Sequence, residues 1–234
     1  MKTTALLPFA LLAAGCATRY GTEVAICDEL FPTGTRVVMW DEAGGFDAYS
    51  HDPAFPLELP EDAEPPTGAR YGHRVPRDAA LAAEVEASGW TLDALRRQVD
   101  QVVVHYDAAG TSRRCFRILQ DLRGLSCHFL IDVDGTVYQC LDLRERAWHA
   151  GTANDRSVGI ELAQIGAWPE ERRDVLEEHY AEDALGPYLV LPDGPDRGQL
   201  PPGLVGRPAA RPARRRGPGP VLAAVRLTRA QCGP

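Results

Sequence analysis

The chain has 234 residues and a formal net charge of −8 at pH 7. This length suffices for one domain with a substantial buried core and also permits two small domains; we favour one. The negative charge argues against nucleic acid as the main partner, because phosphate binding needs a basic surface. The charge is uneven, since residues 197–234 contain eight arginines and no acidic residue, which leaves −16 on residues 1–196.

Residues 1–16 have the pattern of an export signal. Lys2 precedes an apolar stretch from Ala5 to Ala14, which is well short of the roughly 20 residues of a membrane-spanning helix. The small residues that end in Gly15-Cys16 resemble a bacterial lipobox, in which the cysteine is lipidated. We therefore expect a periplasmic lipoprotein anchored through Cys16, in the outer membrane; an ordinary cleaved signal peptide and a secreted protein are the alternative.

If Cys16 carries lipid, five cysteines remain, an odd number that cannot all pair. They are Cys27, Cys115, Cys127, Cys140 and Cys232. No CxxC motif occurs, so neither a thioredoxin-like redox site nor a cysteine-rich zinc module is indicated. We expect most of these cysteines to be small buried apolar residues.

The segment before the first helix has mixed character. Residues 36–40 form a β-type run that ends at the turn signal Gly44-Gly45. Residues 52–66 contain five prolines and several acidic residues, which favours an extended surface connection. We assign residues 17–76 to an N-terminal extension and a Pro-rich linker.

Two helices are predicted next. One begins after Asp78 and places Leu81 and Val85 on one face. A shorter one follows the N-cap candidate Thr91, with Leu92 and Leu95 directed inward. Both are interpreted as scaffold.

The segment from residue 101 predicts most of the sheet. The β-branched residues 102–104 are typical of a strand buried on both faces, and His105 comes at its end. Residues 127–132 and 136–141 predict two strands joined by the turn at Asp134-Gly135. Residues 157–162 predict a further strand that carries Glu161.

One helix is predicted between these strands, after the polar loop of residues 107–112. Its inward residues are Cys115, Phe116, Leu119 and Leu122. Because strands and helices alternate irregularly and include a hairpin, we predict an α/β (α+β) fold with a mixed sheet flanked by helices.

Polar side chains at or near the strand ends are the candidates for chemistry: His105, His149 and Glu161. A single histidine after a hydrophobic strand is more often a hydrogen-bonded structural residue than a ligand. Burying the carboxylate of a glutamate inside an apolar strand costs free energy unless it is paired with a positive charge or takes part in the chemistry of a site. The structural alternative for Glu161 is a salt bridge to Arg144 or Arg156.

Five motifs occur in order over about residues 100–170. They are His105-Tyr106-Asp107, Ser126-Cys127-His128-Phe129-Leu130-Ile131-Asp132, Asp134-Gly135-Thr136-Val137-Tyr138-Gln139, Arg146-Ala147-Trp148-His149-Ala150-Gly151 with Asn154, and Ser157-Val158-Gly159-Ile160-Glu161. Together they resemble the type 2 N-acetylmuramoyl-L-alanine amidases, a family related to phage T7 lysozyme and the peptidoglycan recognition proteins.

The resemblance implies a zinc hydrolase that cuts the amide between N-acetylmuramic acid and L-alanine in peptidoglycan or muropeptides. By matching position, His105 would be a zinc ligand and Glu161 the general base. Trp148, His149 and Asn154 would contact the substrate, and zinc ligation by His149 is the minority alternative. Cys127 stands where some members place a catalytic tyrosine, so that role is absent from this position.

The expected remainder of the zinc site does not occur in the sequence. Family members supply a histidine in a Gly-His phrase and an aspartate or cysteine before Pro-Gly or a similar turn, and neither phrase is found. His179 lies in a helix-like run, where an exposed helical position is the simpler interpretation. The resemblance therefore also admits a non-catalytic peptidoglycan- or muropeptide-binding protein, or an inactive truncated amidase.

The last segment, residues 197–234, is rich in arginine and proline. The chain has 24 arginines against one lysine, which suggests a GC-rich gene. Translation of such a gene in the wrong reading frame tends to produce arginine- and proline-rich segments. We hypothesise a frameshift or premature stop after about Arg207, which leaves the amidase domain, residues 77–196, incomplete at its C-terminus. The alternative is a native basic, disordered tail that binds anionic lipid or cell-wall polymer.

Overall fold

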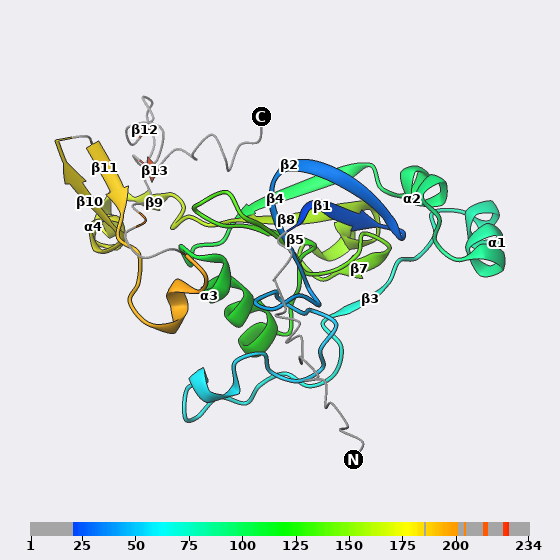
Figure 1. The fold of residues 1–234 in the computed structure, drawn as a ribbon, viewed down its shortest axis with the longest axis horizontal. Coiled ribbons are helices and arrows are strands. Elements are labelled where there is room, and N and C mark those ends of the chain that lie inside the picture. Colours follow the sequence, from blue (N-terminus) through cyan, green and yellow to red (C-terminus); the bar gives the residue numbers. More distant parts are fainter. Residues whose placement is uncertain (1–20, 185, 201–203, 205–212, 215–221, 225–234) are drawn as a thin grey trace, which may run out of the picture.

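The computed structural model describes residues 21–184, 186–200, 204, 213–214 and 222–224 (Figure 1). The predicted export signal, the lipidation candidate Cys16, Cys232 and most of the Arg/Pro-rich segment lie outside the described residues. Within the described part, no helix has the length and apolar character that a membrane span requires.

A six-stranded mixed sheet forms the centre of the fold, with the strand order β1-β2-β6-β5-β8-β4. The strands are β1 (Gly21–Ile26), β2 (Glu29–Met39), β6 (Val137–Gln139), β5 (Phe129–Ile131), β8 (Ser157–Leu162) and β4 (Gln101–Tyr106). The pairs β1/β2 and β5/β6 are antiparallel, whereas β2/β6, β5/β8 and β4/β8 are parallel. The predicted α+β class with a mixed sheet is confirmed.

One face of the sheet packs against α3 (Ser112–Arg117), which continues into a π-helical segment, η2 (Ile118–Arg123) (Figure 1). Cys115, Phe116 and Leu119 are buried there, as predicted, in the same cluster as Leu130 of β5. Leu122 is 40% exposed instead of buried. The wider π-helical turn changes the spacing of the inward positions, which the α-helical pattern did not anticipate.

The helices α1 (Ala79–Ser88) and α2 (Leu92–Gln98) lie at one end of the molecule. Both begin where predicted, and each has a side-chain N-cap: the Asp78 carboxylate accepts a hydrogen bond from Leu81 N, and Oγ1 of the predicted cap Thr91 accepts one from Ala94 N. Each cap satisfies an amide that has no partner inside its helix.

The strand β4 differs from its prediction. Val102, Val104 and Tyr106 are 63%, 57% and 53% exposed, so the strand is not buried on both faces. In the described part of the chain, β4 pairs only with β8 and forms an edge of the sheet. The β-branched run correctly predicted a strand, but its position in the sheet is set by tertiary pairing.

Part of the segment assigned to the N-terminal extension joins the same sheet. Residues 21–39 form β1 and β2, and β2 pairs with β6. The strand β3 (Tyr71–His73) pairs with β7 (Glu145–Ala147), just before Trp148. The Pro-rich residues 52–66 contain one short 3-10 turn, η1 (Pro56–Glu58).

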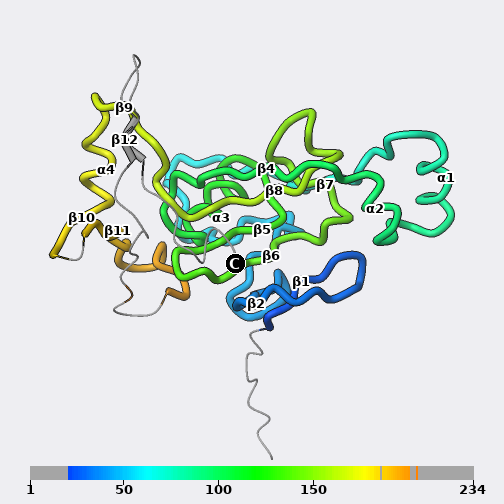
Figure 2. Tube along the Cα trace, turned by 90° about the horizontal axis from the view of Figure 1, so that it is seen from above, coloured from blue at the N-terminus to red at the C-terminus, as the bar shows by residue number. Residues whose placement is uncertain are grey.

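Segments after β8 contribute most of a second cluster of buried apolar residues, at the end of the molecule opposite α1 (Figure 2). The elements in this part of the chain are β9 (Trp168–Pro169), η4 (Glu170–Arg172), α4 (Arg173–His179), β10 (Tyr180–Asp183), β11 (Gly186–Leu189) and η5 (Pro195–Arg197). The short strand β13 (Leu222–Ala224) pairs with β12 (Ala213–Arg214) and with β9. His179 is the last residue of α4, where its Nδ1 lies 2.8 Å from Val175 O. His179 is therefore helical as expected, but it is half-buried and not exposed.

Candidate functional site

Parallel pairing of β4 with β8 brings two predicted site residues together. His105 and Glu161 are direct register partners, so their side chains lie on the same face of the sheet. Glu161 is also the register partner of Leu130 on β5, which places it on the face that packs against α3. His105 and Glu161 therefore lie on adjacent strands with their side chains on the same face of the sheet.

His149 joins this pair from the loop after β7. Its Nδ1 lies 3.2 Å from His105 Nε2, and the two rings are nearly perpendicular, at 85°. The His149 ring covers Gly159, where an added Cβ would come within 2.7 Å of the ring. A glycine at this point of β8 is therefore required for the ring to reach His105.

The loop that carries His149 is held by neighbouring polar groups. The Asn154 side-chain oxygen accepts hydrogen bonds from His149 N at 3.2 Å and from Ala150 N at 2.7 Å. Ser157 Oγ lies 3.2 Å from His149 Nε2. Asn154 lies in the 3-10 segment η3 (Gly151–Arg156) and is buried. Its observed contacts shape the loop, and its contact with a substrate stays a prediction.

Trp148 is half-buried beside the same loop. Its backbone N donates to Ser126 Oγ at 3.0 Å, and its carbonyl accepts from Ser126 N at 3.2 Å. A Cβ at Gly72 of β3 would lie 3.5 Å from the indole Nε1. The indole therefore packs against β3, and its predicted role in substrate contact stays a prediction.

Glu161 has the electrostatics of an acid–base group. It is 9% exposed, and burial raises its pKa to about 7, with only a small opposing effect from Arg123. Arg144 pairs with Asp28 and Asp142, and Arg156 pairs with Asp100. In the described residues, the salt bridge considered for Glu161 is therefore not formed.

Asp107 is a second buried acid near the site, to which the sequence analysis gave no role. Its Oδ1 accepts hydrogen bonds from Ala109 N, Gly110 N and Gln164 N at 2.9, 2.9 and 3.1 Å. Its Oδ2 has no hydrogen-bond partner within the described residues. Burial, with a smaller contribution from Glu161, raises its pKa to about 8. The sequence feature that could have identified Asp107 is its position as an acidic residue directly after an apolar strand.

Arg74, which the sequence analysis did not single out, is a buried centre of hydrogen bonds behind the His149 loop. Its Nε donates to Leu143 O at 2.8 Å, its Nη1 to Asn154 O and Asp155 O, and its Nη2 to Ser157 O, each at 3.0 Å. Because these carbonyls come before and after the loop, one guanidinium fixes both of its ends.

His128 is fully buried next to Arg74. Its Nδ1 accepts a hydrogen bond from Gly159 N at 3.0 Å, so its proton sits on Nε2, 3.1 Å from Glu145 O. Burial and the charge of Arg74 lower the pKa of His128 to about 3. His128 is therefore a neutral structural residue that fixes β8 beneath His149.

The described cysteines are free, and Cys115, Cys127 and Cys140 are buried, as expected, whereas Cys27 is half-buried. Cys127 Sγ donates to Phe129 O at 3.2 Å. Hydrogen bonding with Cys140, together with burial, raises the pKa of Cys127. Its thiol is therefore engaged in the core.

The described residues contain no group of three or more His, Cys, Asp or Glu side chains arranged to hold a metal ion. The predicted ligand His105 has His149 as its nitrogen neighbour, so the described part offers a pair of imidazoles. Catalytic zinc usually has three protein ligands. The pair fits part of such a site, and the fuller ligand set is not found within these residues.

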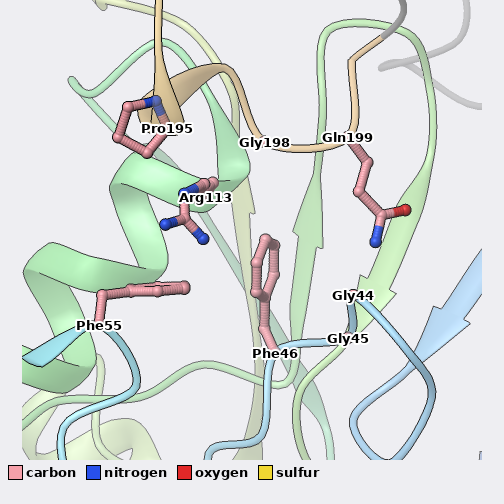
Figure 3. A pocket seen from close by; sticks show the side chains of 8 residues that line it. All are labelled: Gly44, Gly45, Phe46, Phe55, Arg113, Pro195, Gly198 and Gln199. Carbon is pink, nitrogen blue, oxygen red and sulfur yellow. The ribbon is translucent and has the colours of Figure 1, made fainter. Parts of the chain in front are cut away.

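A cavity of about 340 Å³ lies elsewhere, between the loop at Gly44, the start of α3 and the segment around η5 (Figure 3). Arg113 lies over the Phe55 ring, 3.8 Å from its centre, and pairs with Glu58. None of the predicted site residues lines this cavity, so it is separate from the candidate site.

Comparisons with known proteins find similarity over part of the chain, in the region of this site. A search of curated proteins finds no match. Among solved structures, the chain is similar to one described as the crystal structure of a Se-Met AmpD derivative, with 23% identity and a TM-score of 0.24. The match covers 44% of this chain and 62% of that one, so the chain spans less than two thirds of that protein. Residues 95–186, which include His105, His149 and Glu161, match the model of the family N-acetylmuramoyl-L-alanine amidase.

Proposed function

We propose that this protein hydrolyses the amide between N-acetylmuramic acid and L-alanine in peptidoglycan or muropeptides, with zinc as cofactor. The observation that carries the proposal is the register pairing of His105 with Glu161, with His149 3.2 Å from His105. A half-buried imidazole beside an acid with a pKa of about 7 is an arrangement that metal-assisted amide hydrolysis can use.

Glu161 is the general base in this proposal. A pKa near neutrality allows its carboxylate to take a proton from the attacking water and then to deliver a proton to the leaving amine. A bound zinc ion would supply a Lewis acid for the amide carbonyl. His105 would hold the ion, and Trp148 with His149 would contact the muropeptide.

The alternative is a non-catalytic muropeptide-binding protein. It is favoured by one observation, that the described residues form no three-ligand metal group. The loop held by Arg74 and Asn154 keeps Trp148 and His149 in place through protein hydrogen bonds alone. A substrate-contacting surface of this kind does not require zinc.

Incubation of the purified full chain with intact peptidoglycan, with and without added zinc sulfate, separates these functions. Mass spectrometry would detect released stem peptides with a free L-alanine amino group, and sedimentation with insoluble peptidoglycan would measure binding. Zinc-dependent release supports the hydrolase. Binding without release supports the alternative, and neither binding nor release contradicts both.

We also propose that Cys16 anchors the protein to the membrane facing the periplasm. The support is the Gly15-Cys16 sequence after a short apolar stretch. Cys16→Ser is expected to move the protein from the membrane fraction to the soluble fraction, because the lipid would be missing. Equal fractionation of the parent and the variant would contradict the anchor, and Cys27→Ser is the matched control.

A further inference from the structure

We propose that Cys127 and Cys140 form a disulfide bond when this chain folds in the presence of a thiol oxidant. Both thiols are free in the structure. They lie in the buried cluster between the sheet and α3, which also contains Cys115. This modification site is separate from the proposed hydrolase and does not depend on it.

The pairing of β5 with β6 brings the two cysteines close. Cys140 directly follows β6, and its backbone N donates to His128 O at 2.8 Å. Cys127 is the residue before His128. Since paired residues lie roughly 5 Å apart and one residue adds roughly 3.4 Å along a strand, this pairing places the Cα atoms of Cys127 and Cys140 roughly 6 Å apart. Disulfides span Cα separations of about 4.4–6.8 Å.

The two side chains also lie on the same side of the sheet. In a fully regular pair of strands they would face opposite sides, because side chains alternate along a strand. The strand β5 begins only at Phe129, so Cys127 lies outside the regular alternation. Cys127 and Cys140 are 2% and 1% exposed and share one cluster with Phe116 of α3. Their thiols are hydrogen-bonded to each other, so the two sulfur atoms are neighbours.

Formation of the bond removes two electrons and two protons from the thiols. With glutathione disulfide as the oxidant, one cysteine thiolate attacks a glutathione sulfur and releases the first glutathione thiolate. The other cysteine thiolate then attacks the protein sulfur of the mixed disulfide, which closes the Cys127–Cys140 bond and releases the second glutathione thiolate. The two glutathione thiolates take up the two protons.

Burial determines when this bond can form. Hydrogen bonding with Cys140, together with burial, raises the pKa of Cys127, which makes its thiolate scarce in the folded protein. A side chain that is 2% exposed is also closed to glutathione. We therefore expect the bond to form during folding, while β5 and β6 pair and before α3 covers them. Once formed, it is shielded from reductants by the same burial.

The direct test is refolding of the full chain from urea in a buffer of reduced and oxidised glutathione. The soluble fraction is then alkylated in denaturant and digested with trypsin. Cys127 and Cys140 fall in one tryptic peptide, residues 124–144, whereas Cys115 falls in residues 115–117. We expect the 124–144 peptide to lose the mass of two hydrogen atoms and to take up no alkylating reagent. In the same buffer with urea retained, a smaller fraction of this peptide should be cross-linked.

Cys115→Ser is the matched control variant, because Cys115 is buried in the same cluster and should not be needed for the bond. This variant should retain the cross-link, whereas Cys127→Ser should leave Cys140 alkylated. The cross-linked parent should unfold at a higher urea concentration than its reduced form, since the bond restricts the unfolded chain.

A doubly alkylated 124–144 peptide after refolding would overturn the inference, as would a link between this peptide and residues 115–117. Equal cross-linking with and without urea would also overturn it, because the fold would then not select the pair. A cross-linked chain that unfolds at a lower urea concentration than the reduced chain would show that the fold does not accommodate the bond, and would reject the site.

Discussion

Replacement of Arg74 by alanine is expected to lower the free energy of unfolding by about 4 kcal/mol, because it removes a buried charged donor from four backbone carbonyls. Arg74 is 3% exposed, and its partners include Leu143, Asn154 and Ser157. Water cannot easily replace the guanidinium at this depth, so the carbonyls would remain unsatisfied. Urea unfolding of the parent and the variant measures the difference.

Arg77→Ala is the matched control for this prediction. The Arg77 side chain is 44% exposed and pairs with Asp100, so its loss should cost less than about 1 kcal/mol. Arg74→Lys should lie between the parent and Arg74→Ala, because lysine keeps the charge but cannot donate in all these directions. Equal stability of Arg74→Ala and Arg77→Ala would show that the Arg74 hydrogen bonds contribute little.

Glu161→Gln is expected to reduce stem-peptide release by about 100- to 10,000-fold, since glutamine cannot accept the proton from water. In the parent, the base form of Glu161 increases as the pH rises through about 7. The rate should therefore rise over that range and then level off. A rate–pH profile with saturating zinc would measure both effects.

Stability provides the control for Glu161→Gln. The pKa of Glu161 is raised from 4.5 to about 7, so its favourable contribution to folding is complete below 4.5 and is lost as the pH rises through 7. Glutamine stays neutral, and the variant should be at least as stable as the parent at pH values above 7. A variant that is folded at such pH values and still releases peptide at the parental rate would exclude Glu161 as the base.

The sequence allowed much of the site to be predicted because its residues lie in short, ordered motifs. His105, His149 and Glu161 were each identified, and register pairing then brought His105 beside Glu161. The helix starts at Asp78 and Thr91 were predictable because N-capping is local chemistry. Motifs and helix caps of this kind can be recognised from the sequence because they do not depend on the tertiary arrangement.

The supporting residues could not be predicted in the same way. Arg74 is one of 24 arginines, and nothing in its neighbourhood shows that it becomes buried against residues 143–157. Its role depends on the pairing of β3 with β7, which is a tertiary event. The exposure of Val102 and Val104 has the same origin, because a β-branched run indicates a strand but not its place in the sheet.

The exposed β4 edge has a consequence for how the protein behaves at high concentration. Its outer backbone amides and carbonyls are not paired with another described strand, and Val102, Val104 and Tyr106 add an apolar surface beside them. Such an edge is a template on which a second chain can add a strand. Because His105 lies on this same strand, self-association there would also immobilise the backbone that carries the site, so solubility and catalysis would depend on the same six residues.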